Sequence, residues 1–220
     1  EEQIFGLQED KRINVPLVLL NSETVPGGDG IVETIGFDYE EMGRELGKQI
    51  LREQTVNKQV HLFREQDPDE VSIRFGDGIL SELEQAGCAI VMHESSGKDK
   101  LRHAAGQIAV KEGEHAVIIV LDPAGLTETA QAISEAGDDW QIGGLYGRGN
   151  TVRLLNYLDR GVIQGLCITD DFSAGYLSVK MAVELAENRI AEDTQKLESR
   201  YIRREDLRNV EYEKMLFPIE

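Results

Sequence analysis

Apolar runs of strand length alternate with amphipathic stretches of helix length along the whole chain. Runs such as VPLVLLN and HAVIIVLD are continuously apolar, which is typical of strands buried on both faces of a sheet. Strands that alternate with helices predict a parallel sheet with helices on both faces, and therefore an α/β fold. The predicted strands are Val15–Asn21, Ile31–Phe37, Gln59–Phe63, Cys88–His93, Ala116–Leu121, Gln141–Tyr146 and Val162–Thr169.

Acidic residues mark the starts of several predicted helices. Asp38 stands before the first helix, and Asp122 stands before a Pro in the first turn of another; both arrangements are typical of helix N-caps. After residue 196 the chain is strand-like (LESRYI), then a charged turn (RREDLRN), and it ends in a short apolar stretch. The predicted helices cover residues 39–54, 69–86, 99–112, 124–137, 149–160 and 172–191.

Composition narrows the class of protein. The chain has 220 residues, 40% of them apolar, which is enough for one α/β core or for two small ones that share a cleft. It carries 41 acidic against 23 basic residues, a formal net charge of −18, which repels phosphate backbones and anionic lipids at long range. We therefore expect no direct contact of these residues with nucleic acid.

Cysteine usage gives no evidence of a metal site. Cys88 and Cys167 each lie in an apolar run, without the partners that zinc spacing requires, so two buried thiols are expected; a disulfide between them stays open. No stretch approaches the roughly 20 apolar residues of a membrane span. The first ten residues, EEQIFGLQED, lack the pattern of a signal peptide, and any targeting segment would lie outside this sequence.

Five segments, in order, resemble the sugar-binding periplasmic receptors and the effector domains of the lactose-repressor family. The first is VPLVLLNSE with the later ETIGFDYEEMG, in which Asp38 and Gly43 fall at the family's spacing. The others are SIRFGDGILSELEQAGCAIV, AVIIVLDPAGLTETAQAI, WQIGGLYG and LLNYLDRGVIQGLCITDDFSAGYLSVKMAVEL. The resemblance covers about 200 residues and implies a two-lobed periplasmic-binding-protein-like fold, with parallel sheets flanked by helices.

The same resemblance implies how the lobes divide the chain. Residues 36–165 match a complete second lobe, whereas residues 1–35 and 166–220 match a partial first lobe whose opening strands would precede Glu1. A half-built lobe exposes sheet edge or core. We therefore expect a partner chain, a rearrangement or disorder there, and a second copy forming a homodimer is one candidate partner.

In this family, polar side chains at the strand ends bind the ligand. The register of the resemblance puts Phe75, with Arg74 beside it, at the family's Arg, and Leu121 at its Asn; Tyr146 falls at its Asp and Thr169 at its Gln. All four positions have changed type, so the expected sugar contacts are missing, and a planar ligand stacked on Phe75 and Tyr146 is the natural alternative. An equal alternative makes Phe75 and Leu121 core, Tyr146 a loop aromatic and Arg74 a solvated helix residue.

Acidic residues at strand ends complete the candidate site. Asp38, Asp122 and the pair Asp170-Asp171 follow predicted strands, and the competing interpretation of each is a helix cap. The predicted ligand-binding residues are Asp38, Arg74, Phe75, Asp122, Tyr146, Thr169 and Asp170.

The sequence contains no recognisable set of catalytic residues. The segment Gly144–Gly149 lacks the Lys-Ser/Thr pair of a phosphate loop, and the four histidines are scattered without a nucleophile beside them. We therefore expect no enzyme activity, no cofactor and no metal.

Three functions fit these expectations. The first is an extracytoplasmic solute receptor, periplasmic or lipid-anchored at the cell surface, that serves a membrane transporter or a sensor kinase. The second is the cytoplasmic effector domain of a transcription regulator, since the same two lobes serve both roles. The third is a sensory module that works through protein contacts alone.

Overall fold

The computed structural model describes residues 17–20, 32–54, 59–95, 97–187 and 197–216. Contacts divide the chain into a smaller unit, residues 1–38 and 170–198, and a larger unit, residues 39–169 and 199–220. This differs from the predicted division in the last segment, because its described residues, 199–216, pack with the larger unit and not with the smaller one.

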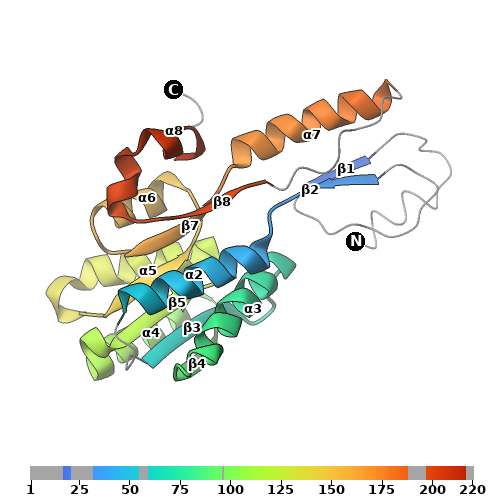
Figure 1. Ribbon diagram of the computed structural model, residues 1–220. Helices are drawn as coiled ribbons and strands as arrows, with labels where there is room; N and C mark the ends of the chain where they lie inside the picture. The colour runs from blue at the N-terminus through green and yellow to red at the C-terminus, as the bar shows by residue number, and fades with distance from the viewer. Residues whose placement is uncertain (1–16, 21–31, 55–58, 96, 188–196, 217–220) are drawn as a thin grey trace. The chain divides into compact units, whose positions relative to one another are not determined.

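A six-stranded sheet forms the centre of the larger unit (Figure 1). The strand order is β4-β3-β5-β6-β7-β8, and neighbouring strands are parallel except β8, which runs antiparallel to β7. The strands are β3 (Gln59–Glu65), β4 (Ile90–Ser95), β5 (Ala116–Val120), β6 (Gly144–Arg148), β7 (Gly165–Thr169) and β8 (Ser199–Ile202).

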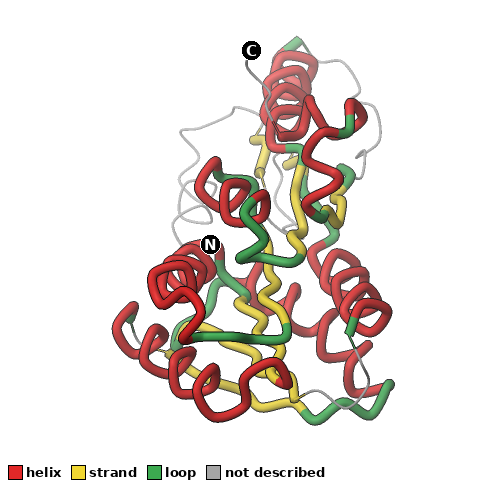
Figure 2. The backbone as a smooth tube through the Cα atoms, turned by 90° about the vertical axis from the view of Figure 1, so that its left-hand side faces the viewer, coloured by secondary structure: helices red, strands yellow, loops and turns green. Residues whose placement is uncertain are grey.

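Helices cover both faces of this sheet (Figure 2). One face carries α2 (Tyr39–Glu53) and α3 (Glu70–Gln85), and the other carries α4 (Lys98–Glu112), α5 (Pro123–Ala136), α6 (Val152–Asp159) and the short α8 (Val210–Leu216). All five residues of β5, AVIIV, are buried, as expected for a central strand covered on both faces. Short 3₁₀ turns η1 (Gly113–His115), η2 (Gly137–Asp139) and η3 (Arg204–Arg208) complete the unit.

Glycines bring α2 and α3 into close contact. A Cβ added at Gly43 would lie 2.1 Å from the carbonyl oxygen of Phe75, and one at Gly78 would lie 2.0 Å from that of Glu40. The two helix backbones therefore touch at positions where no side chain larger than hydrogen fits.

The described part of the smaller unit is a parallel pair of strands and a helix. These are β1 (Leu17–Leu20), β2 (Val32–Ile35) and α7 (Asp171–Ala186). Ile35, Met181 and Leu185 form its buried cluster. An apolar stripe at helical spacing stays exposed on α7, made of Phe172, Tyr176, Val179 and Val183.

The predicted α/β fold is confirmed, and each predicted strand and helix has a counterpart. The main discrepancy is β6, which was expected at residues 141–146 but spans Gly144–Arg148. This shift of two to three residues changes which side chains lie at the carboxyl end of the strand.

Candidate functional site

The carboxyl ends of the parallel strands meet at one edge of the larger unit's sheet. The chain leaves β3 for its neighbour β4 on one side and returns to β5 on the other. The loops after β3 and β5 therefore diverge at a topological switch point, the position where open α/β sheets bind ligands. We call this edge the switch-point site.

Arg148 occupies the centre of the switch-point site. It is the last residue of β6, and its side chain is only 14% exposed. Its Nε donates a hydrogen bond to the carbonyl oxygen of Leu121 at 2.9 Å, and its Nη2 donates to the Oγ of Ser72 at 3.1 Å. The guanidinium thus joins the ends of β5 and β6 to the first turn of α3.

Acidic and aromatic groups surround this cation. The Oδ1 of Asp69 lies 3.8 Å from Arg148 Nη2, and the ring centroid of Tyr39 lies 5.9 Å from its Cζ. Burial lowers the pKa of Arg148, while the charges of Asp69, Tyr39 and Asp122 oppose that shift. Partial burial would raise the pKa of Asp69, but hydrogen bonds from Ser72 and the charge of Arg148 hold it below its usual value. Arg148 and Asp69 therefore present a charged pair at neutral pH.

The start of α3 is fixed by its own cap. Asp69 is the N-cap residue, and its Oδ1 accepts from the backbone N–H of Ser72 at 2.7 Å. The same two residues that begin the helix therefore also contact Arg148. Asp69 is exposed, so its second carboxylate oxygen can face a ligand.

Two of the predicted residues, Asp122 and Thr169, lie at this edge. Asp122 caps α5, where its Oδ1 accepts from the N–H of Gly125 at 2.5 Å. Thr169 ends β7, and its carbonyl oxygen accepts from the side chain of Asn150 at 3.2 Å. Asp122 therefore has the capping role that was the competing interpretation, while both residues keep a position beside Arg148's strand.

The other predicted positions are more scattered. Arg74 is half-buried on α3, and Asp38 is half-buried directly before α2. Asp170 belongs to the smaller unit, where it caps α7 by accepting from the N–H of Ser173 at 2.9 Å and from its Oγ–H at 2.7 Å.

The stacking surface predicted on Phe75 and Tyr146 is not formed, because both side chains are fully buried. Phe75 is one of the buried residues of α3. The hydroxyl of Tyr146 accepts from Gln54 Nε2 at 2.6 Å and donates to Glu53 Oε2 at 3.1 Å, near the amino end of β6 where Gln54 also donates to the carbonyl oxygen of Gly143. Burial accordingly raises the pKa of Tyr146. Both rings thus fill the core instead of offering a face to a ligand.

Replacing Tyr146 by Phe is expected to lower the free energy of unfolding by about 1–2 kcal/mol, because the hydrogen bonds to Glu53 and Gln54 are lost from a buried site. Ligand affinity should not change. Urea denaturation and a binding titration of the same variant measure the two quantities. A large loss of affinity in a variant that stays folded would restore Tyr146 to the ligand site.

Sequence reasoning missed Arg148, Asp69, Ser72 and Tyr39. The strand was expected to end at Tyr146, which hid Arg148. Two signals were available: Gly149, a residue type that permits the φ of 127° found directly after β6, and Asp69, a residue type preferred at helix N-caps.

The thiols and the histidines form no metal site in the described part of the chain, where no group of three or more His, Cys, Asp or Glu residues could hold an ion. Cys167 is buried, its Sγ lies 3.7 Å from the carbonyl oxygen of Met42, and burial raises its pKa. Cys88 is half-buried, and both residues carry free thiols. None of the described helices has the length and apolar character of a membrane span.

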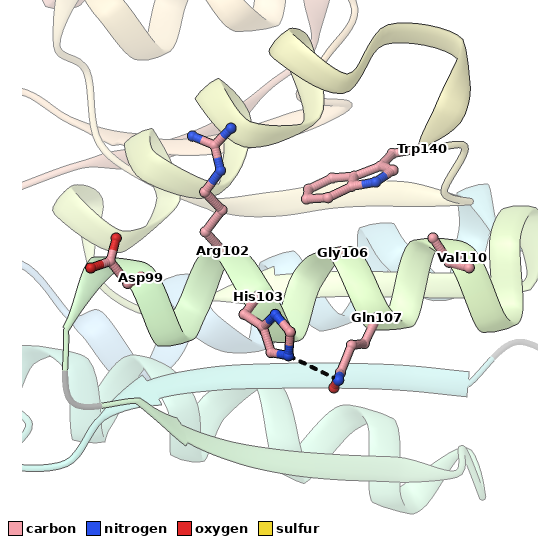
Figure 3. A pocket seen from close by; sticks show the side chains of 7 residues that line it. All are labelled: Asp99, Arg102, His103, Gly106, Gln107, Val110 and Trp140. Carbon is pink, nitrogen blue, oxygen red and sulfur yellow. Dashed lines mark hydrogen bonds between the residues drawn. The ribbon is translucent and has the colours of Figure 1, made fainter.

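A separate groove of about 580 Å³ runs along the outer side of α4 (Figure 3). The indole of Trp140 lies against Gly106, where an added Cβ would be 2.4 Å from the ring. Polar side chains of this groove are engaged: Arg102 bonds to Glu135 at 2.7 Å, and His103 bonds to Gln107 at 3.0 Å. Arg148 is not among the residues that line this groove.

A parallel sheet with polar side chains gathered at its switch point is the architecture of small-molecule-binding α/β proteins. The periplasmic binding protein domain family matches residues 7–190, and the chain belongs to this family. The predicted family and the predicted class, a receptor module that binds a small molecule, are thereby confirmed. No curated protein matches the chain in sequence.

Several solved structures share this fold. One is a glucose–galactose binding protein from Geobacillus stearothermophilus, with 18% identity and a TM-score of 0.74, over 91% of this chain and 71% of that one. Another, from Agrobacterium vitis, is an ABC transporter solute-binding protein bound with α-D-tagatopyranose, with 12% identity and a TM-score of 0.81, over 98% and 76%. The XylFII–LytSN complex is similar at 12% identity and a TM-score of 0.71, over 90% and 70%.

Proposed function

We propose that the chain binds a small hydroxylated ligand, such as a monosaccharide, at the switch-point site, and that it serves as an extracytoplasmic solute receptor. The observation that carries this proposal is Arg148, a guanidinium held at the carboxyl edge of the sheet by Leu121 and Ser72. A planar cation beside the carboxylate of Asp69 offers donors and acceptors side by side, as ring hydroxyls require.

The hydroxylated class is favoured over a planar aromatic one. A stacking ligand would need exposed aromatic faces, and the two that were predicted are buried in the core. Two of the similar structures are a glucose–galactose binding protein and a solute-binding protein bound with α-D-tagatopyranose. That the ligand lies in a cleft between two lobes stays a prediction.

Partners and location follow from the receptor role. A membrane transporter or a sensor protein is the expected partner, since the similar structures include an ABC transporter component and the XylFII–LytSN complex.

We propose no enzyme activity, and no nucleic-acid contact because of the net charge of −18. A homodimer, a lipid anchor and the lobe boundaries remain predictions. A helix-turn-helix encoded upstream would instead favour the effector domain of a regulator.

A thermal-shift screen of the full protein tests the ligand class. The panel contains D-glucose, D-galactose and D-tagatose, with nucleosides and amino acids as comparison classes. A sugar present at 100 times its dissociation constant should stabilise the folded protein by about 2.7 kcal/mol, because it binds only that state. A thermal shift with nucleosides alone, or the absence of a shift with every compound of the panel, would contradict the proposal.

A further inference from the structure

Three ionisable side chains form a hydrogen-bonded chain inside the larger unit, outside the switch-point site. The Nε2 of His61 lies 2.8 Å from Glu112 Oε2, and its Nδ1 lies 2.9 Å from His93 Nε2. His61 is 3% exposed, and His93 stacks on Phe63 with ring centroids 4.5 Å apart. The three groups come from β3, β4 and the C-terminal end of α4, so the hydrogen bonds tie these elements together.

We propose that Glu112, His61 and His93 form an acid-sensitive latch, which holds the edge strand β4 and the end of α4 to the sheet. Among the described strands β4 has only one neighbour, β3, so it depends on such contacts more than the central strands do. The latch concerns the larger unit alone and does not depend on the proposed ligand.

The latch works because only one proton fits between the two rings. With both rings neutral, His93 Nε2–H donates to His61 Nδ1, and His61 Nε2–H donates to Glu112. One added proton is tolerated, since His61 can then donate from both nitrogens while His93 keeps its proton on Nδ1. A second added proton places N–H groups on both facing nitrogens, and the hydrogen bond is lost.

The surroundings resist this second proton. Burial lowers the pKa of His93, the charge of His61 lowers it further, and Glu112 opposes both. Glu112 shares its charge with Lys111, whose Nζ lies 4.0 Å from its other oxygen. β5, on the far side of β3, contributes only apolar side chains, and the ion pair of Arg64 and Glu94 lies at the carboxyl ends of β3 and β4.

The sign of the pH effect follows from this shift. A histidine whose pKa is lower in the folded state than its ordinary value of 6.5 binds fewer protons folded than unfolded. Its contribution to stability is complete above pH 6.5 and is lost progressively as the pH falls below that value. Opening should begin locally, at β4 and the end of α4.

Hydrogen exchange of the full protein between about pH 7.5 and about pH 5 tests the latch, after correction for the intrinsic rate. Protection of β4 and α4 amides should fall about tenfold for each unit by which the pKa of His93 is depressed. In H93Q, whose amide still donates to His61 but does not titrate, this fall should disappear. H103Q is the control, because His103 lies exposed on α4, the helix that carries Glu112, and this variant should behave as the wild type.

Equal pH dependence of the wild type and H93Q would overturn the proposal. If H93Q does not fold, ¹⁵N spectra of the wild-type histidine rings decide the question. The expected result is a His93 ring whose pKa lies below its ordinary value of 6.5. A His93 ring with a pKa at or above that value would overturn the latch.

Discussion

Replacing Gly78 by Ala is expected to lower the free energy of unfolding of the larger unit by about 2–3 kcal/mol. The added Cβ would lie 2.0 Å from the carbonyl oxygen of Glu40 and 2.8 Å from the backbone nitrogen of Arg44, so α2 and α3 must separate. This cost exceeds the gain of about 1 kcal/mol that Ala brings to a helix interior. Urea denaturation measures the difference.

Gly175→Ala on α7 is the matched control, since nothing lies within 4 Å of the Cβ that it adds. It should be neutral, or stabilising by up to about 1 kcal/mol. Ligand binding should weaken in the Gly78 variant, because Arg148 is flanked by the first residues of the two helices that would move. A Gly78 variant as stable as the wild type would show that the helices are not in backbone contact.

Replacing Arg148 by Met is expected to raise the dissociation constant of the ligand about 30-fold or more, which corresponds to a loss of about 2 kcal/mol. The change removes the donors that we propose for ligand binding and leaves the carbonyl oxygen of Leu121 without its partner at 2.9 Å. Stability should also fall, by about 1–3 kcal/mol. Calorimetric titration and thermal unfolding of the same preparation separate the two effects.

Arg153→Met provides the comparison for this prediction. Arg153 is an exposed arginine on α6 that bonds to Gln131 at 2.7 Å, so its loss should leave affinity unchanged. R148K should be intermediate, because lysine keeps the charge but not the planar pair of donors. Wild-type affinity in a folded R148M protein would place the ligand elsewhere.

Much of the fold could be predicted because the hydrophobic pattern of a strand and the cap of a helix are determined by residues that are neighbours in the sequence. The continuous apolar run of β5 and the Asp122-Pro123 start of α5 each depend on a few neighbouring residues, and both predictions match the structure. The position of β8 was harder to predict, since nothing local in LESRYI shows that this strand pairs antiparallel with β7.

The site was harder to predict because it depends on where strands end and which of them are neighbours. Ending β6 at Tyr146 placed a core side chain at the ligand edge and left Arg148 out. The latch is a similar case. The three residues of the latch, His61, His93 and Glu112, are far apart in sequence. They meet only because β3 pairs in parallel with β4 and because α4 ends beside β3.

Calorimetric titration of the full protein with the three panel sugars tests the central claim most directly. At least one sugar should give a saturable heat with one site per chain and a dissociation constant of about 10 µM or lower, and R148M should raise that constant about 30-fold or more. If none of the three gives a saturable heat up to about 1 mM, which is about −4 kcal/mol of binding free energy, the claim that the chain is a monosaccharide receptor is contradicted.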